Sequence, residues 1–146
     1  MIRSIAKGDG KRLLERLGRY EKKSCARCVT WIHAVSVGEF VSAVPIISKL
    51  VEDNDSNPIL VTTTTNTASK LVVETFGQKV EHVFLPFDIP IILRRFFCCF
   101  EPSRLILLET ELWPNLLNLC ETRKTPVYLV NARLSERSFK SYRVLK

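Results

Sequence analysis

Long hydrophobic runs are missing from this sequence of 146 residues. Its most apolar stretch, residues 89–100, is broken by Arg94 and Arg95 and is shorter than the roughly 18 residues that a membrane span requires. The amino terminus also lacks the apolar core of a secretion signal. We therefore expect a cytosolic chain without a membrane-spanning helix.

Glycine and proline are scarce, with 5 and 7 residues, and the sequence contains neither repeats nor low-complexity tracts. Hydrophobic residues make up 46% and charged residues 25% of the chain, which is the ordinary balance of a globular domain. These values exclude a largely disordered chain. The length allows one domain with one core.

Metal and redox motifs are also lacking. The five cysteines are an odd number in a chain without an export signal, which indicates reduced thiols. Cys25 and Cys28 form a lone CxxC pair, with no second pair or histidines at zinc-binding spacing. Asp53 and Asp55 match a DxD metal motif, but they follow a predicted helix at the rim opposite the candidate site. We therefore expect no metal ion or other cofactor.

Positive charge is concentrated at the amino terminus. Residues 1–30 contain nine basic and three acidic side chains, which accounts for most of the net charge of +7. Such a leader suits an anionic lipid or nucleic-acid surface, or is a solvated tail. Nucleic acid is disfavoured, because Tyr20 is the only aromatic residue in this segment. We divide the chain into a basic leader with a short helix, residues 1–27, and one domain, residues 28–146.

Short apolar segments alternate with amphipathic segments after residue 28. The apolar segments predict strands at residues 28–35, 59–64, 80–85, 104–108 and 127–130. The amphipathic segments predict helices at residues 39–51, 67–76, 90–100 and 114–123, and a further helix from residue 135. Asn66 is the expected cap of the second of these helices, and Gly77 is its expected end.

This alternation predicts an α/β fold, a Rossmann-like parallel sheet of about five strands with helices on both faces. The expected strand order is 3-2-1-4-5. In such sheets the loops after the carboxyl ends of the strands form the binding site. These loops hold the most polar segments of the domain, so we expect the site at that rim.

The loop after the first strand holds the first candidate residues, Ser36, Gly38 and Glu39. Gly38 permits a close backbone approach or a positive φ angle. Glu39 lies in the first turn of a predicted helix, where its carboxylate tends to stay ionised. An ionised carboxylate in a cleft can act as a base, although a role in favouring the helix dipole fits the same position. The dinucleotide-binding pattern GxGxxG is absent.

The other strand ends supply further polar candidates. They are Thr63 and Thr64 after the second strand, Glu109, Glu111, Trp113 and Asn115 after the fourth, and Asn131 and Arg133 after the fifth. Trp113 offers an apolar platform for a sugar or acyl ligand, and Arg133 suits bidentate contact with an anionic group. Threonines also favour strands and caps, and Glu111 and Trp113 also fit capping and edge packing, so structural roles remain open.

Five strings occupy these strand ends: HAVSVGEF (33–40), LVTTTTNTAS (60–69), VFLPFDIP (83–90), ETELWPN (109–115) and VNARLSERS (130–138). Together they resemble the amino-terminal, acceptor-side domain of bacterial 3-deoxy-D-manno-octulosonic acid (Kdo) transferases. The strings follow the family's order over roughly residues 12–146. ELWPN and NARLSERS are far more specific than any single glycine pattern.

The resemblance implies one half of a GT-B glycosyltransferase of lipopolysaccharide core biosynthesis. In that family this half receives the lipid A precursor (lipid IVA), and the other half holds the donor CMP-Kdo. It further implies inverting transfer without a metal ion, by a peripheral enzyme at the cytoplasmic face of the bacterial inner membrane. Glu39 matches the family's general base, and Glu109 matches a group that stabilises the transition state. The other rim candidates are then expected to bind substrate.

The sequence departs from the family pattern in three respects. A donor-binding half and an apolar amino-terminal anchor are missing, and Ala68 stands where many members have glycine. We therefore expect residues 1–146 to require a donor domain and to use the basic leader for contact with anionic membrane. The alternative is a truncated, non-catalytic remnant that at most binds acceptor lipid.

Overall fold

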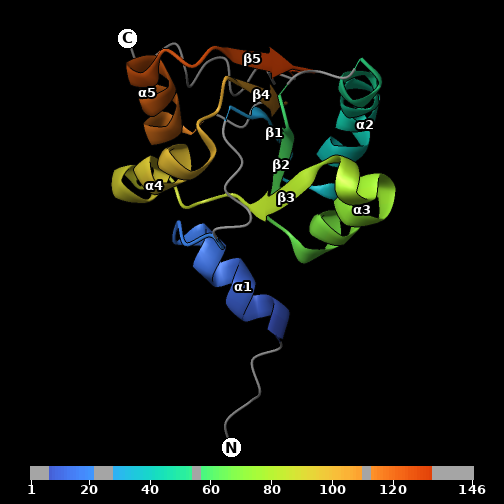
Figure 1. Cartoon of the computed structure of the whole chain (residues 1–146), viewed down its shortest axis with the longest axis horizontal. Helices are drawn as coiled ribbons and strands as arrows, with labels where there is room; N and C mark the ends of the chain where they lie inside the picture. The colour runs from blue at the N-terminus through green and yellow to red at the C-terminus, as the bar shows by residue number, and fades with distance from the viewer. Residues whose placement is uncertain (1–6, 22–27, 54–56, 110–112, 133–146) are drawn as a thin grey trace, which may run out of the picture.

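The computed structural model describes residues 7–21, 28–53, 57–109 and 113–132 (Figure 1). Its five strands are β1 (Thr30–His33), β2 (Ile59–Thr63), β3 (Glu81–Phe84), β4 (Arg104–Leu108) and β5 (Val127–Val130). They form one sheet in the order β3-β2-β1-β4-β5, and all neighbouring pairs are parallel. The predicted fold class and strand order are thus confirmed.

Helices cover both faces of this sheet, as predicted (Figure 1). On one face lie α2 (Val37–Glu52) and α3 (Asn66–Phe76), and on the other lie α4 (Pro90–Phe100) and α5 (Pro114–Arg123). A hydrophobic core fills the space beneath each helix pair. Every residue of β1 and β2 is buried, because these inner strands are covered from both sides.

Trp31 of β1 anchors the core beneath α4 and α5. Its ring centroid lies 4.4 Å from that of Phe96, and its Nε1 donates a hydrogen bond of 2.8 Å to Thr62 Oγ1 in β2. The indole is fully buried, and this bond satisfies its polar atom. The bond also ties the two inner strands together close to their carboxyl ends.

The boundaries of α3 correct one expectation and confirm another. Thr65 caps the helix, because its side chain accepts a hydrogen bond from Ala68 N, and Asn66 is already the first helical residue. The predicted cap was therefore one residue too late. Gly77 ends the helix as expected, at a φ angle of +55° that glycine adopts without strain. A short 3-10 turn, η2 (Gly77–Lys79), then leads into β3.

Helix α1 (Lys7–Arg16) lies within the predicted leader and packs against β3 (Figure 1). Its Glu15 side chain is buried. The chain after it turns back at Gly18, whose φ angle is +72°, and passes close to the first turn of α4. The division of the chain at residue 27 stays a prediction. The helix that we expect from residue 135 lies outside the described residues.

The cysteines differ from the expectation of reduced thiols at one position. Cys28, Cys98 and Cys120 are free, and only Cys120 of these is buried. Cys99 is disulfide-bonded, so the expectation was wrong for this residue. Sequence spacing does not reveal which thiols the fold brings together.

Candidate active site

The candidate residues of the described chain lie at the carboxyl ends of the strands, where β1, β2, β4 and β5 pass into their following loops. Ser36 caps α2, and its side chain accepts a hydrogen bond from Glu39 N at 3.3 Å. Gly38 and Glu39 stand in the first turn of that helix. Because β1 is the middle strand of the sheet, this loop occupies the centre of the rim.

The carboxylate of Glu39 is held from two sides. Val35 N donates to Oε2 at 2.8 Å, and Ser36 Oγ donates to Oε1 at 3.1 Å. The side chain is only 6% exposed. Each carboxylate oxygen has a second lone pair, so both retain one acceptor position. The arrangement resembles a capping box, and it also fixes the orientation that a base would need.

Gly38 does not have the positive φ angle that we considered, since it lies inside α2. A Cβ atom at this position would meet only Ser36 Oγ, at 3.9 Å. The protein itself therefore does not require a glycine here. Gly38 as a substrate-binding residue stays a prediction.

The two threonines at the carboxyl end of β2, Thr63 and Thr64, are engaged within the protein. Thr64 Oγ1 donates to the Val35 carbonyl oxygen at 2.9 Å, which joins the β1 and β2 loops. Thr63 is fully buried, and its Oγ1 lies 2.9 Å from Nε2 of His82. Burial, and secondly the nearby charge of Lys11, lower the pKa of His82 to about 4. Thr63 as a substrate-binding residue stays a prediction.

The residues that directly follow β4 and β5 have left-handed backbone conformations. Glu109 after β4 has a φ angle of +58°, and Asn131 after β5 has one of +55°. Asn131 tolerates this region better than most residues, whereas a glutamate there is uncommon. Glu109 N donates to the Val130 carbonyl oxygen at 2.9 Å, which fixes the turn. Strained positions of this kind cluster at functional sites.

His33, at the end of β1, is buried beside the Trp113 ring, with a centroid separation of 6.4 Å. Thr62 Oγ1 accepts the Trp31 N–H, so its own hydrogen is available to His33 Nδ1, 2.9 Å away. In this arrangement Nδ1 accepts and Nε2 carries the proton. If Nδ1 instead donated to the Thr62 carbonyl oxygen, 3.2 Å away, the Thr62 hydroxyl would lose its acceptor.

Burial lowers the pKa of His33 to about 4, so the ring is neutral at pH 7. Within the part of the chain that the structure describes, its Nε2 is buried without a hydrogen-bond partner, and Trp113 Nε1 shares this property. Both rings thus place a ring nitrogen without a hydrogen-bond partner among the described residues at the β1–β4 part of the rim. Trp113 also packs against the core beneath α4 and α5, which is the packing role that the sequence left open, and its role as a ligand platform stays a prediction.

Asp88 is a structural residue of the rim that we did not select from the sequence. Its carboxylate accepts the backbone N–H groups of Leu116 and Asn115, at 2.8 and 3.1 Å. The Asn115 side chain donates to the Asp88 carbonyl oxygen at 2.8 Å. Asp88 therefore caps α5 from the preceding loop, because Trp113 at the cap position supplies no side-chain bond. Two prolines in the sequence signalled a helix start after each loop: Pro90, two residues after Asp88, and Pro114, directly after Trp113.

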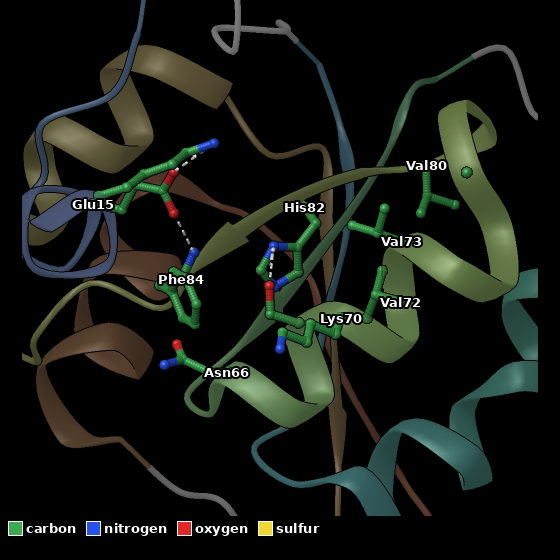
Figure 2. Close-up of a pocket in the computed structure, with 11 residues that line it drawn as sticks. Glu15, Asn66, Lys70, Val72, Val73, Val80, His82 and Phe84 are labelled. Atoms are coloured by element: carbon green, nitrogen blue, oxygen red, sulfur yellow. Dashed lines mark hydrogen bonds and ion pairs between the residues drawn. The ribbon is translucent and has the colours of Figure 1, made fainter. Parts of the chain in front are cut away.

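A cavity of about 560 Å³ opens beside this rim, between α1 and α3 and over the outer strand β3 (Figure 2). Valine side chains and Phe84 form much of its wall, and Lys11 and Lys70 contribute positive charge. Glu15 reaches across from α1 to β3 (Figure 2). The cavity has the size of a small-molecule site, but none of the rim candidates lines it.

The remaining residues singled out from the sequence are those of the DxD motif, together with Glu111 and Arg133. Asp53 caps the carboxyl end of α2 and pairs with Lys49 at 2.8 Å, away from the rim. Among the described residues no group of three or more His, Cys, Asp or Glu side chains is arranged to hold a metal ion. Asp55, Glu111 and Arg133 lie outside the described residues.

A five-stranded parallel sheet with its polar side chains at the carboxyl rim defines a Rossmann-like domain. The family model described as 3-deoxy-D-manno-octulosonic-acid transferase (kdotransferase) matches residues 11–146. The chain therefore belongs to the Kdo transferase family and corresponds to its amino-terminal domain. The predicted family resemblance is confirmed.

Curated relatives carry the same description. A 3-deoxy-D-manno-octulosonic acid transferase from Haemophilus influenzae is 43% identical over 136 residues, or 92% of this chain and 32% of its own length. A probable mitochondrial one from Arabidopsis thaliana is 37% identical, over 88% of this chain and 29% of its own length. A 3-deoxy-D-manno-octulosonic acid transferase from Rickettsia felis is 39% identical, over 82% of this chain and 25% of its own length. The chain thus spans a third or less of these relatives.

Proposed function

We propose that this domain is the acceptor side of an inverting glycosyltransferase that transfers Kdo from CMP-Kdo to a lipid A precursor. Membership of the Kdo transferase family supports the group transferred. The observation that carries the proposal within the molecule is the held carboxylate of Glu39, at the centre of the carboxyl rim. A carboxylate fixed in this way is suited to accept a proton from a bound hydroxyl.

In this mechanism Glu39 removes the proton from a primary hydroxyl of the acceptor disaccharide. The hydroxyl oxygen forms a bond to the anomeric carbon of Kdo, from the face opposite the phosphate. The bond between that carbon and the phosphate oxygen breaks, and CMP leaves with the bonding electrons. The proton stays on Glu39 until solvent removes it. We assign no metal ion to this step.

Glu109 is proposed to stabilise positive charge that develops on the sugar ring in the transition state. Its position after β4, next to β1 in the sheet, supports this role. Its left-handed backbone gives further support, since such strain is retained where function requires a particular direction of a side chain.

The acceptor would contact the residues around these two carboxylates. We propose that Ser36, Gly38 and Thr64 border the reacting hydroxyl, and that the Trp113 ring packs against a sugar or acyl group. Asn131 is exposed, and Asn115 is exposed with its side-chain nitrogen bonded to Asp88, which leaves its oxygen for a ligand. Thr63, Glu111 and Arg133 complete the proposed set.

Attachment to the cytoplasmic face of the inner membrane is proposed to occur through α1. Leu13, Leu14 and Leu17 are exposed on the outer face of this segment, at 54%, 46% and 37%. Exposed basic residues flank them at Lys11 and Arg19. Apolar side chains next to cations are typical of helices that lie in the surface of an anionic membrane. No helix among the described residues meets the length and hydropathy of a membrane span.

Transfer also requires a bound donor. We propose that the donor binds to a second half of a GT-B enzyme, for which the greater length of the relatives leaves room. The second candidate function is acceptor binding without transfer. The small share of the relatives that this chain covers favours that outcome for residues 1–146 assayed alone. Incubation with CMP-Kdo and lipid A precursor, with and without the donor-side portion of the Haemophilus influenzae relative, separates the two.

The catalytic assignment is tested by Glu39→Gln in an enzyme that joins residues 1–146 to a donor-side half. We expect turnover to fall about 10²–10⁴-fold, the usual contribution of a general base. Thr65→Ala is the matched control, because it removes the cap of α3 and leaves Glu39 intact. A Glu39→Gln enzyme within threefold of the parent would remove Glu39 from the mechanism.

A further inference from the structure

Helix α1 is built into the candidate site through its inner face. Arg12 Nη2 donates to the Thr64 carbonyl oxygen at 2.8 Å. Glu15 Oε2 accepts the Phe84 N–H at 2.8 Å, as Figure 2 shows. These two bonds join α1 to the carboxyl ends of β2 and β3, which lie more than fifty residues further along the chain. The guanidinium of Arg12 also lies 5.7 Å from the centre of the Phe84 ring.

The bond from Arg12 continues towards the proposed base. Thr64 donates twice to the Val35 carbonyl oxygen, from its hydroxyl at 2.9 Å and from its backbone N–H at 3.4 Å. The Val35 N–H in turn donates to Glu39 Oε2 at 2.8 Å. Three successive contacts therefore join Arg12 to the loop after β2, that loop to the loop after β1, and the Val35 N–H to the Glu39 carboxylate.

We propose that Arg12 is a positioning residue for Glu39, acting through the loops after β1 and β2. The proposal rests on the role of Glu39 as the base. A hydrogen bond from a cation is stronger than one between neutral groups, so Arg12 restrains the Thr64 peptide firmly. The restrained Thr64 holds the Val35 carbonyl group through its hydroxyl and backbone N–H, and so keeps the Val35 N–H in place against the carboxylate. Small displacements of a reacting group reduce rates steeply.

This role separates Arg12 from the exposed cations Lys11 and Arg19 of the same segment. Its side chain is half-buried and directed at Thr64, whereas Lys11 and Arg19 are exposed. Arg19 is available to an anionic surface, and Arg12 is already engaged. Arg12 and Arg19 are thus a matched pair in which only Arg12 is expected to act on catalysis.

The test compares Arg12→Ala, Arg12→Lys and Arg19→Ala in the enzyme that joins residues 1–146 to a donor-side half. Arg12→Ala should lower kcat about ten- to a hundredfold and leave the KM for the acceptor within threefold. A weaker bond to the Glu39 carboxylate disfavours its charged form, so the acidic limb of the kcat profile should move to higher pH. Arg12→Lys keeps one donor and should recover most of kcat.

Two further measurements keep the outcomes distinct. Thr64→Val removes the hydroxyl link to Val35 without touching Arg12, and should move the acidic limb in the same direction even if Arg12→Ala folds poorly. Co-sedimentation of the 146-residue chain with anionic vesicles should be weakened by Arg19→Ala and unchanged in Arg12→Ala.

Unchanged kcat and an unmoved acidic limb in Arg12→Ala and Thr64→Val, with Glu39→Gln still inactive, overturn the positioning role alone. A raised KM with weakened vesicle binding in Arg12→Ala would assign the residue to the membrane surface and also overturn it. Full activity of Glu39→Gln overturns the proposed function instead.

Discussion

Glu109 combines a charged side chain with a backbone conformation that other residues adopt more easily. At a φ angle of +58° the Cβ atom of an L-residue is crowded, which destabilises it by about 1–2 kcal/mol. Lys124, which ends α5 at a φ angle of +56°, has the same backbone strain away from the rim. The two residues therefore allow strain and side-chain function to be measured separately.

We predict that Glu109→Gly keeps or raises the melting temperature and yet lowers turnover at least tenfold. The relief of about 1–2 kcal/mol of strain is partly offset by the greater freedom that glycine gives the unfolded chain, which costs about 0.5–1 kcal/mol. Lys124→Gly should give the same stability change with unaltered turnover. A Glu109→Gly enzyme that is less stable and still active would show that the side chain has a structural role only.

For single residues, the sequence predicts which side chains pair locally better than it predicts backbone conformation or protonation. Ser36 and Glu39 follow the S-x-x-E spacing of a helix start, and this spacing predicts the hydrogen bond between them. The strain at Glu109 is not predicted, because no local pattern requires a glutamate there to be left-handed. The tautomer of His33 is also hidden, since it depends on Thr62 in a neighbouring strand.

Among the elements, α5 depends on a cap supplied by another part of the chain. Asp88 accepts two of its first backbone N–H groups, and a carboxylate there also favours the positive end of the helix dipole. Asp88→Ala should therefore lower the free energy of unfolding by about 1–2 kcal/mol. Chemical denaturation measures this loss. Asp53→Ala, which breaks only an exposed ion pair, should change stability by less than about 0.5 kcal/mol.

The elements themselves were largely predictable, but their docking was not. Hydrophobic periodicity placed α4 and α5 correctly at both ends, because buried stripes and first-turn prolines mark these helices. Charge alone predicted that residues 1–27, which contain α1, form a basic leader separate from the domain. The bonds of α1 to Thr64 and Phe84 join segments far apart in the sequence, and such contacts leave no local signal.

At the scale of the whole molecule, the buried His33 and the half-buried His82 set the response to acid. The pKa of each is lowered to about 4, mainly by burial, against about 6.5 in an unfolded chain. Below pH 6.5 the histidines bind protons in the unfolded chain but not in the folded chain. The free energy of unfolding therefore falls as the pH is lowered to about 4. Glu15 opposes this, because burial raises its pKa and its protonated form favours the fold as pH falls.

We therefore predict that the melting temperature of the chain falls between pH 7 and pH 5, before most carboxylates titrate. Each histidine accounts for about 2 kcal/mol over the 1.5 units below its unfolded pKa. His82→Gln keeps a hydrogen-bonding side chain beside Thr63 and does not titrate, so it should remove about half of this dependence. Calorimetry of both proteins at several pH values measures the two slopes. Equal melting temperatures of the parent at pH 7 and pH 5 would contradict the prediction, because neither histidine could then be buried in its neutral form.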